Sequence, residues 1–240
     1  MIDLIKKLFD LIVLLLSSSS KVAASQAKTN PYGTDQTGTV IDDPEDDDDT
    51  MIKDQQEKVI QVKQIEDNRK IFKEGLVLVL KYEGGFSNIP EDPGGPTNKG
   101  IIQTVYDAYR KSKSLPLQSV EFITDEEVED IYYQRYWLVA VCDKMTPKLS
   151  IAHFDTAVNT GTKQAAKFLQ RSLEIKADGI IGPQTIEKLK TQDENAIIQN
   201  YLEQRRVFYK NLAEKKPTLQ KFLKGWLKRV DSLESYLNAR

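Results

Sequence analysis

The 240-residue sequence has a single cysteine, Cys142, and a single histidine, His153. One cysteine excludes an intramolecular disulfide, so the folded chain must be stabilised by burial of its apolar side chains. The same scarcity excludes a zinc site built from clustered cysteine and histidine ligands. Long apolar runs are missing as well. The uninterrupted run over residues 11–16 is far shorter than the about 20 residues that a membrane-spanning helix needs.

Charge is unevenly distributed along the chain. Residues 1–57 contain five basic and twelve acidic residues, whereas residues 58–240 contain 29 basic and 24 acidic residues. The larger part is therefore mildly basic, which suits an anionic polymer as a partner. A surface whose charges are simply solvated is the alternative explanation, and charge alone does not separate the two.

The N-terminus has the features of an export signal. Two lysines precede an apolar segment over residues 8–16, which only Asp10 interrupts, and small residues follow at 22–24. This order is typical of a secretory signal that is cleaved, here before Ser25. We therefore predict a signal peptide at residues 1–24 and a secreted, periplasmic or cell-envelope location. A peripheral amphipathic anchor or a cytoplasmic protein is the alternative.

A polar, acidic segment follows the predicted signal. Residues 25–57 show no apolar periodicity, and seven of the eight residues from 42 to 49 are acidic. Charges at this density repel one another and cannot be buried, which predicts a disordered linker over residues 25–57. Loose calcium binding is the alternative, but the spacing matches no EF-hand loop.

The rest of the sequence has helical periodicity almost throughout. Helices are predicted at residues 71–83, 104–111, 124–137, 150–160, 163–173, 183–190, 194–214 and 218–237. Thr124 and Glu127 form a capping box, and Pro183 suits the first turn of its helix. Between residues 86 and 100, glycine, proline, asparagine and aspartate leave room only for a short hairpin. We predict an all-α fold, α+β at most, with one small hairpin.

Glu83 is the leading candidate for a catalytic group. It follows Gly75 and Val79 at intervals of four, which predicts that it lies in the last turn of an apolar helix that Gly84 and Gly85 end. A carboxyl group that faces the interior loses hydration and retains a proton more readily. That is the state required of a general acid for a glycosidic oxygen. A glutamate that only reaches solvent from a helix end is the alternative.

The segment that begins at Glu83 carries a long motif, EGGFSNIPEDPGGPTNKGI. It resembles the signature of glycoside hydrolase family 108, a family of bacterial and phage lysozymes. The matching positions are Glu83, Gly84, Gly85, Phe86, Asp92, Gly94, Gly95, Thr97, Gly100 and Ile101. The resemblance implies a lysozyme-like helical fold with Glu83 as the catalytic acid. Ile89 and Pro90 depart from the usual polar loop, which can alter sugar contacts but leaves the acid in place.

Asp92 and Thr97 are the candidates for the second catalytic group. Their spacings from the glutamate resemble those of phage-type lysozymes, in which Glu, Asp and Thr line the cleft. Asp92 can act as a base or stabilise the positive charge that develops on the sugar, and Thr97 can orient a water. A turn aspartate that caps local backbone amides is the alternative for Asp92, and Glu91 is a weaker candidate for its role. The loop glycines are expected to permit positive φ angles.

Further resemblance extends downstream. The segment YYQRYW at residues 132–137 is similar to the family's Tyr-x-x-x-Tyr-Trp helix, and FDTAVNTG at residues 154–161 to the end of its catalytic half. Asp155 and Asn159 lie on one helical face, where they can share a hydrogen bond and support the site. Tyr136 and Trp137 can stack on a sugar, although aromatic residues at helical spacing more often belong to the core.

The C-terminal region resembles the peptidoglycan-binding region that accompanies this family. Two segments carry the likeness, ADGIIGPQT at residues 177–185 and FLKGWLKRV at residues 222–230. We therefore predict a lysozyme-like catalytic domain at residues 58–158 and a helical peptidoglycan-binding domain at residues 159–240.

These features predict a lysozyme, an N-acetylmuramidase that hydrolyses the β-1,4 bond between N-acetylmuramic acid and N-acetylglucosamine in peptidoglycan. The expected catalytic residues are Glu83, Asp92 and Thr97. Peptidoglycan is the expected partner, with no nucleic acid, metal or small-molecule cofactor, and the chain is expected to act as a monomer at the cell wall. The rival functions are a lytic transglycosylase that uses the same glutamate, a chitinase, and a wall-binding protein without catalytic activity.

Overall fold

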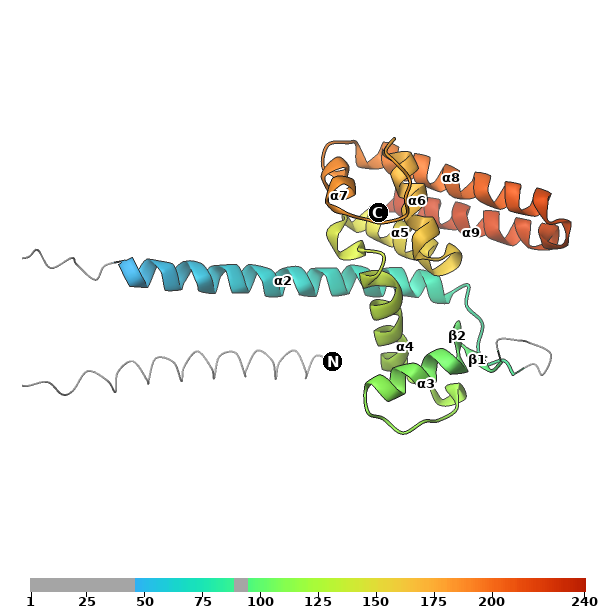
Figure 1. The fold of residues 1–240 in the computed structure, drawn as a ribbon, viewed down its shortest axis with the longest axis horizontal. Helices are drawn as coiled ribbons and strands as arrows, with labels where there is room; N and C mark the ends of the chain where they lie inside the picture. The colour runs from blue at the N-terminus through green and yellow to red at the C-terminus, as the bar shows by residue number, and fades with distance from the viewer. Residues whose placement is uncertain (1–45, 89–94) are drawn as a thin grey trace, which may run out of the picture. The chain divides into compact units, whose positions relative to one another are not determined.

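A computed structural model describes residues 46–88 and 95–240 of the protein, with side chains from residue 55 onward in the first range. Residues 58–240 form one compact unit. The α-helices of the described residues are α2 (Asp46–Leu80), α3 (Gln103–Ser112), α4 (Asp125–Tyr132), α5 (Pro147–Thr160), α6 (Thr162–Ser172), α7 (Pro183–Leu189), α8 (Glu194–Lys215) and α9 (Gln220–Ala239). Strands β1 (Thr97–Asn98) and β2 (Ile101–Ile102) pair antiparallel, with Asn98 opposite Ile101. The predicted all-α fold with one small hairpin is confirmed (Figure 1).

The start of α2 corrects the predicted linker. Residues 25–45 and the predicted signal peptide lie outside the described residues, but α2 begins at Asp46, so residues 46–57 are helical. No glycine or proline occurs from residue 46 to residue 74. Because those two residues are the strongest helix breakers, an uninterrupted polar segment can continue a helix that is anchored further along the chain.

The end of α2 is anchored in an aromatic core. Phe72 and Val79 are fully buried, and the rings of Phe72, Trp137 and Phe154 meet edge to face with centroids 5.4–5.5 Å apart. Gly75 allows α2 to approach α5 closely, because a Cβ atom there would lie 3.2 Å from Cδ1 of Phe154. Trp137 is therefore a core residue. This confirms the alternative interpretation, in which its ring packs in the core and does not stack on a sugar.

Helix α4 carries the predicted capping box. The Thr124 hydroxyl accepts a hydrogen bond from the Glu127 amide, and the Glu127 carboxylate accepts one from the Thr124 amide. The helix then continues as one π-helical segment, Tyr133–Leu138. Tyr132, Tyr133 and Trp137, from the end of α4 and this π-helical segment, are all buried in the aromatic core.

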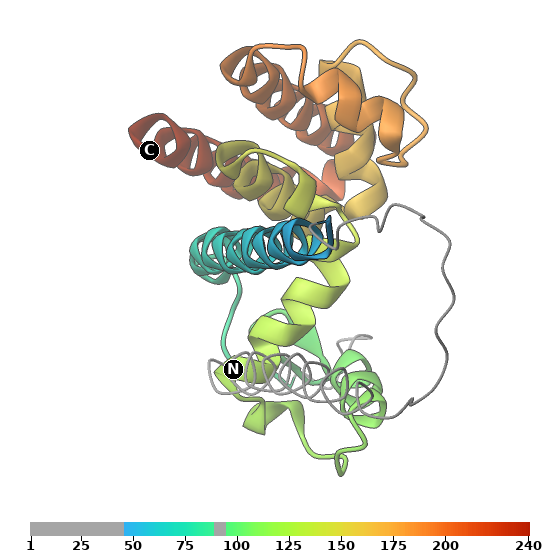
Figure 2. The ribbon, with the colours of Figure 1, turned by 90° about the vertical axis from the view of Figure 1, so that its left-hand side faces the viewer.

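Helix α5 contributes side chains to two cores. Phe154 and Ala157 pack in the aromatic core, whereas Leu149 and Ile151 pack in a second core with α6, α8 and α9. In Figures 1 and 2, α5 accordingly lies between the C-terminal half of α2 and the C-terminal helices. The two predicted halves share this helix and pack as one unit. None of the described helices is long and apolar enough to span a membrane.

Candidate active site

Glu83 lies in the turn after α2 rather than in its last helical turn, which corrects the predicted position. The helix ends at Leu80, and the Tyr82 amide closes the turn by donating to the Val79 carbonyl at 3.0 Å. Two glycines follow Glu83 directly, and glycine is a poor helix former, so the helix stops before the carboxylate is reached. The Glu83 side chain is 22% exposed. It is therefore partly buried and still open to a substrate.

The hairpin is held against the segment that follows Glu83. Ser87 and Thr97 exchange backbone hydrogen bonds of 2.8 and 2.9 Å, and the Lys99 amide donates to the Gly84 carbonyl at 3.1 Å. The Tyr132 hydroxyl donates to the Lys99 carbonyl at 2.9 Å. These four contacts bring the hairpin turn, Lys99 and Gly100, next to the Glu83 carboxylate.

Gly100 is the point of closest approach between the turn and the carboxylate. It has φ +75°, and a Cβ atom there would lie 2.7 Å from Oε2 of Glu83 and 2.5 Å from the Tyr132 hydroxyl oxygen. Any other L residue would be strained at this φ and would push directly on the carboxylate. Gly95 also has positive φ, as expected for the loop, whereas Gly84 and Gly85 do not.

Tyr132 remains a neutral phenol beside Glu83. Burial raises the pKa of the Tyr132 hydroxyl, and the negative charge of Glu83 raises it further. Because its proton is retained, the hydroxyl continues to donate to the Lys99 carbonyl at neutral pH. Tyr132 therefore fixes the turn without contributing charge to the site.

A buried charge network reaches Glu83 from the C-terminal helices. Asp155 in α5 is paired with Arg205 in α8 at 2.6 Å and with Nη2 of Arg229 in α9 at 2.7 Å. Arg229 also places Nη1 3.4 Å from Oε1 of Glu83 and its guanidinium carbon 4.9 Å from the centre of the Tyr82 ring. The Asp155, Arg205 and Arg229 side chains are at most 6% exposed. Charges this deep require paired partners.

The ionisation of Asp155 is set by these arginines. Burial by itself opposes ionisation, but the attraction of Arg205 and Arg229 outweighs it, so the pKa of Asp155 lies below its ordinary value. The predicted hydrogen bond between Asp155 and Asn159 is not formed, because Asn159 accepts one from the Tyr209 hydroxyl instead. Asp155 is instead connected to Glu83 through Arg229, and its support of the site stays a prediction.

The predicted second catalytic group is only partly placed. Asp92 and Glu91 lie outside the described residues, so their roles stay predictions. Thr97 lies in β1, and its hydroxyl donates to the Gly95 carbonyl at 3.1 Å. Within the described residues, no hydrogen bond joins Thr97 to Glu83. Its hydroxyl is bound to Gly95 within its own segment, and the orientation of a water by Thr97 stays a prediction.

Partly exposed aromatic rings flank Glu83. Tyr82 and Phe86 are both 42% exposed, and Tyr136 is half-buried with its ring centre 5.5 Å from that of Tyr132. Exposed aromatic rings beside a carboxylate offer apolar faces against which a sugar can pack. Among the described residues, no group of three or more His, Cys, Asp or Glu side chains is placed to hold a metal ion.

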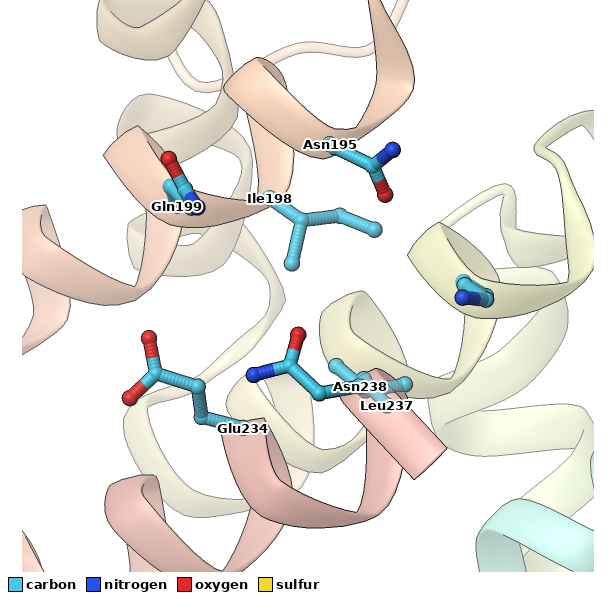
Figure 3. Close-up of a pocket in the computed structure, with 7 residues that line it drawn as sticks. Asn195, Ile198, Gln199, Glu234, Leu237 and Asn238 are labelled. Carbon is cyan, nitrogen blue, oxygen red and sulfur yellow. The ribbon is translucent and has the colours of Figure 1, made fainter. Parts of the chain in front are cut away.

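A separate hollow of about 390 Å³ opens in the C-terminal region (Figure 3). Ile198 and Leu237 form a buried apolar base. The side-chain amides of Asn195, Gln199 and Asn238 surround it. Its lining residues are Lys148, Asn195, Ile198, Gln199, Glu234, Leu237 and Asn238. An apolar base with surrounding amides, which both donate and accept hydrogen bonds, suits a ligand that carries peptide or acetamido groups.

Arg229 and Tyr132 are the site residues that sequence reasoning missed. Both lie inside segments that resemble the family, residues 222–230 and 132–137, but nothing in either segment connects it to Glu83. Arg229 is separated from Glu83 by 146 positions. Spacing along one helix cannot show which residue of another helix its side chains meet.

The chain is similar to known proteins over most of residues 76–231. Residues 76–161 match the family described as Glycosyl hydrolase 108, and residues 164–231 match the Predicted Peptidoglycan domain. Among solved structures, SagA of Brucella abortus has a similar fold, with a TM-score of 0.59 and 29% sequence identity, over 70% of this chain and 94% of that chain. A search of curated proteins found no match. Glu83 lies in the first matched region, and Arg229 lies in the second.

Proposed function

We infer, from the premise that the chain carries a glycosyl hydrolase 108 domain followed by a peptidoglycan domain, that it is a muramidase. The two domains make it a glycoside hydrolase with peptidoglycan as substrate or partner. The bond we propose is the β-1,4 linkage between N-acetylmuramic acid and N-acetylglucosamine. The observation that carries the proposal is the setting of Glu83, a partly exposed carboxylate held between Gly100 and Arg229.

In the proposed reaction, Glu83 begins protonated. Its proton passes to the glycosidic oxygen while the bond from that oxygen to the anomeric carbon breaks, and the bonding electrons leave with the oxygen. A water oxygen forms the new bond to the anomeric carbon and gives up its proton to Asp92 or, through a water that Thr97 orients, to solvent. Glu83 is then reprotonated. Tyr82 and Phe86 provide apolar surface for the sugars on either side.

The stereochemistry of the product tests the role of Asp92. If water attacks directly, the anomeric centre inverts, and the Glu83 and Asp92 carboxyl groups should lie roughly 6.5–9.5 Å apart. Proton NMR during the first minutes of digestion would then show the α-anomer at the new reducing end. The β-anomer would instead indicate a covalent intermediate and would overturn the direct-attack mechanism.

Mass spectrometry of digested peptidoglycan tests the activity itself. We expect the full chain to release fragments with reducing N-acetylmuramic acid ends and the Glu83→Gln variant to release none. Fragments with 1,6-anhydro ends would identify a lytic transglycosylase. Cleavage of chitin oligomers in preference to peptidoglycan would identify a chitinase. Binding to the wall without release of fragments by either protein would leave a wall-binding function alone.

We also propose that the hollow around Ile198 holds part of the wall polymer away from the scissile bond. Three of its seven lining residues, Asn195, Ile198 and Gln199, lie in the region that matches the peptidoglycan domain, and its base and amides suit the acetamido and peptide groups of this polymer. Export through residues 1–24 is proposed as well. N-terminal sequencing of the protein recovered outside the cytoplasm should begin at Ser25, and a protein that retains Met1 would contradict cleavage.

A further inference from the structure

The contact between Arg229 and Glu83 joins the two matched regions in one site. Arg229 comes from α9, and its guanidinium divides its nitrogens between two carboxylates. Nε and Nη2 lie 2.9 and 2.7 Å from Oδ2 of Asp155, whereas Nη1 lies 3.4 Å from Oε1 of Glu83. Asp155 therefore fixes the guanidinium, and the remaining nitrogen faces the candidate acid.

The ionised Glu83 carboxylate balances the net charge of the buried network. Arg205 and Arg229 are two buried positive charges, and Asp155 is the one buried negative charge between them. With Glu83 protonated, this group carries a net charge of +1. With Glu83 ionised, the net charge is zero. A buried positive excess is unfavourable, so the network favours the carboxylate that remains after Glu83 has given up its proton.

The other neighbours of Glu83 do not supply a competing positive charge. Tyr132 on α4 and Tyr82, which directly precedes Glu83, carry no positive charge. Burial raises the pKa of the Tyr132 hydroxyl, so this side chain stays a neutral phenol. The Lys99 ammonium of the hairpin turn is paired with Asp125. Among the described residues, Arg229 is therefore the cation that faces the carboxylate directly.

We propose that Arg229 is a positioning residue for Glu83, which makes the peptidoglycan domain a structural part of the catalytic site. By attracting the carboxylate, Arg229 promotes release of the proton to the glycosidic oxygen and holds the carboxylate beside Gly100 between turnovers. The proposal rests on the proposed role of Glu83 as the acid. It assigns to the second matched region a function beyond binding to the wall.

The test compares full-chain Arg229→Gln, Arg229→Lys and Arg205→Gln. Either glutamine substitution leaves Asp155 with one arginine, so the remaining buried pair is balanced and folding is expected. Only Arg229 contacts Glu83, which makes Arg205→Gln the matched control for loss of a buried arginine. Each variant is assayed for kcat and KM on soluble peptidoglycan fragments between pH 4 and pH 9, with circular dichroism as the check of folding.

For Arg229→Gln we expect kcat to fall about 10- to 100-fold. We also expect the alkaline limb of the kcat profile to move up, because the positive charge that lies 3.4 Å from the Glu83 carboxylate is removed. Arg229→Lys, which retains the charge, should keep the limb near that of the parent and recover part of kcat. Arg205→Gln also removes a buried positive charge, but one that does not contact Glu83, so it should move the limb less than Arg229→Gln does.

Two outcomes would overturn the inference while leaving the proposed function intact. One is an unchanged alkaline limb in Arg229→Gln, with Glu83→Gln inactive. The other is an equal shift in Arg205→Gln, which would mean that the number of buried positive charges, rather than the contact between Arg229 and Glu83, moves the limb. If Glu83→Gln keeps its activity, the proposed function itself is wrong. If Arg229→Gln does not fold, Arg229→Lys becomes the test. An alkaline limb of its kcat profile that is displaced from that of the parent would overturn the inference, because this variant retains the positive charge.

Discussion

Nη1 of Arg229 lies 3.4 Å from Oε1 of Glu83, although 146 positions separate the two residues. The turn after α2 carries the carboxylate, and α9 carries the guanidinium. Asp155 in α5 binds the other side of the same guanidinium, so Arg229 contacts both carboxylates. Through Arg229, the candidate acid is thus connected to α5, the helix that contributes to both cores.

Replacing Gly100 by alanine should reduce activity more than stability. The added Cβ would lie 2.7 Å from Oε2 of Glu83, and displacement of a catalytic group by about 1 Å can cost about 100-fold in rate. The positive φ adds a penalty of roughly 1–2 kcal/mol to folding. Rates on peptidoglycan and urea unfolding of the same preparation measure the two effects.

Gly161→Ala is the matched control for Gly100→Ala. Gly161 also has positive φ, but a Cβ atom there would meet nothing within 4 Å. It should lose stability while keeping the rate per folded molecule. Equal rates for the Gly100 and Gly161 variants would contradict the idea that Gly100 makes room for the carboxylate.

Tyr132→Phe should loosen the hairpin turn. It removes the hydrogen bond to the Lys99 carbonyl, which is worth about 1 kcal/mol of folding free energy, and should lower kcat about tenfold by freeing Gly100 and Glu83 to separate. Tyr106→Phe is the control, because it deletes another buried hydroxyl, one bonded to Glu127 at 2.6 Å. Steady-state rates of both variants measure the difference. A fall in kcat for Tyr106→Phe as large as that for Tyr132→Phe would contradict a specific role of the Tyr132 hydroxyl.

Asp155→Asn should strongly destabilise the fold. It leaves Arg205 without a charged partner and Arg229 with only the Glu83 carboxylate, and loss of one partner from a buried pair costs about 3–5 kcal/mol. Asp231→Asn breaks an ion pair with Arg206 in which the aspartate is 63% exposed, so it should cost under about 1 kcal/mol. Similar urea midpoints for these two variants would show that the buried network does not stabilise the fold as expected.

The protein should lose stability as the pH falls from about 6.5 to about 4. Burial lowers the pKa of His153 from 6.5 to about 4, so over this range the unfolded chain takes up a proton that the folded chain does not. The contribution is fully present above pH 6.5 and amounts to about 3 kcal/mol lost by pH 4. Urea unfolding of the parent and of His153→Gln at pH 7 and pH 4 tests this. An equal loss in the variant would assign the acid sensitivity to other groups.

Substitution of Asn195 and Gln199 by alanine should weaken wall binding without changing the rate on short soluble fragments. Both amides line the hollow around Ile198, and each lost hydrogen bond is worth roughly 1 kcal/mol. Sedimentation with insoluble sacculi measures the binding. Asn200→Ala is the control, because Asn200 is exposed on the same helix but does not line the hollow. Unchanged sedimentation of the double variant would place wall binding elsewhere.

The sequence by itself determined the local features of this protein. Helical spacing identified the helices from α3 to α9 to within three residues, apart from the end of α4, where a π-helical segment covers the last predicted residues. The Thr124–Glu127 capping box formed as predicted. These features depend on residues three or four positions apart, which a linear pattern records directly. The motif that begins at Glu83 likewise indicated the similarity to glycosyl hydrolase 108 that residues 76–161 show, because its residues are contiguous, and the catalytic role of Glu83 stays a prediction.

Only the tertiary structure decided what surrounds Glu83. The helix ends three residues before it, Gly100 approaches it across a hairpin, and Arg229 reaches it from α9. Asp155 was expected to bond within its own helix but pairs with Arg205 and Arg229, 50 and 74 positions away. Burial of a charge requires a partner of opposite sign, and which partner is available depends on how the helices pack rather than on spacing within any one of them.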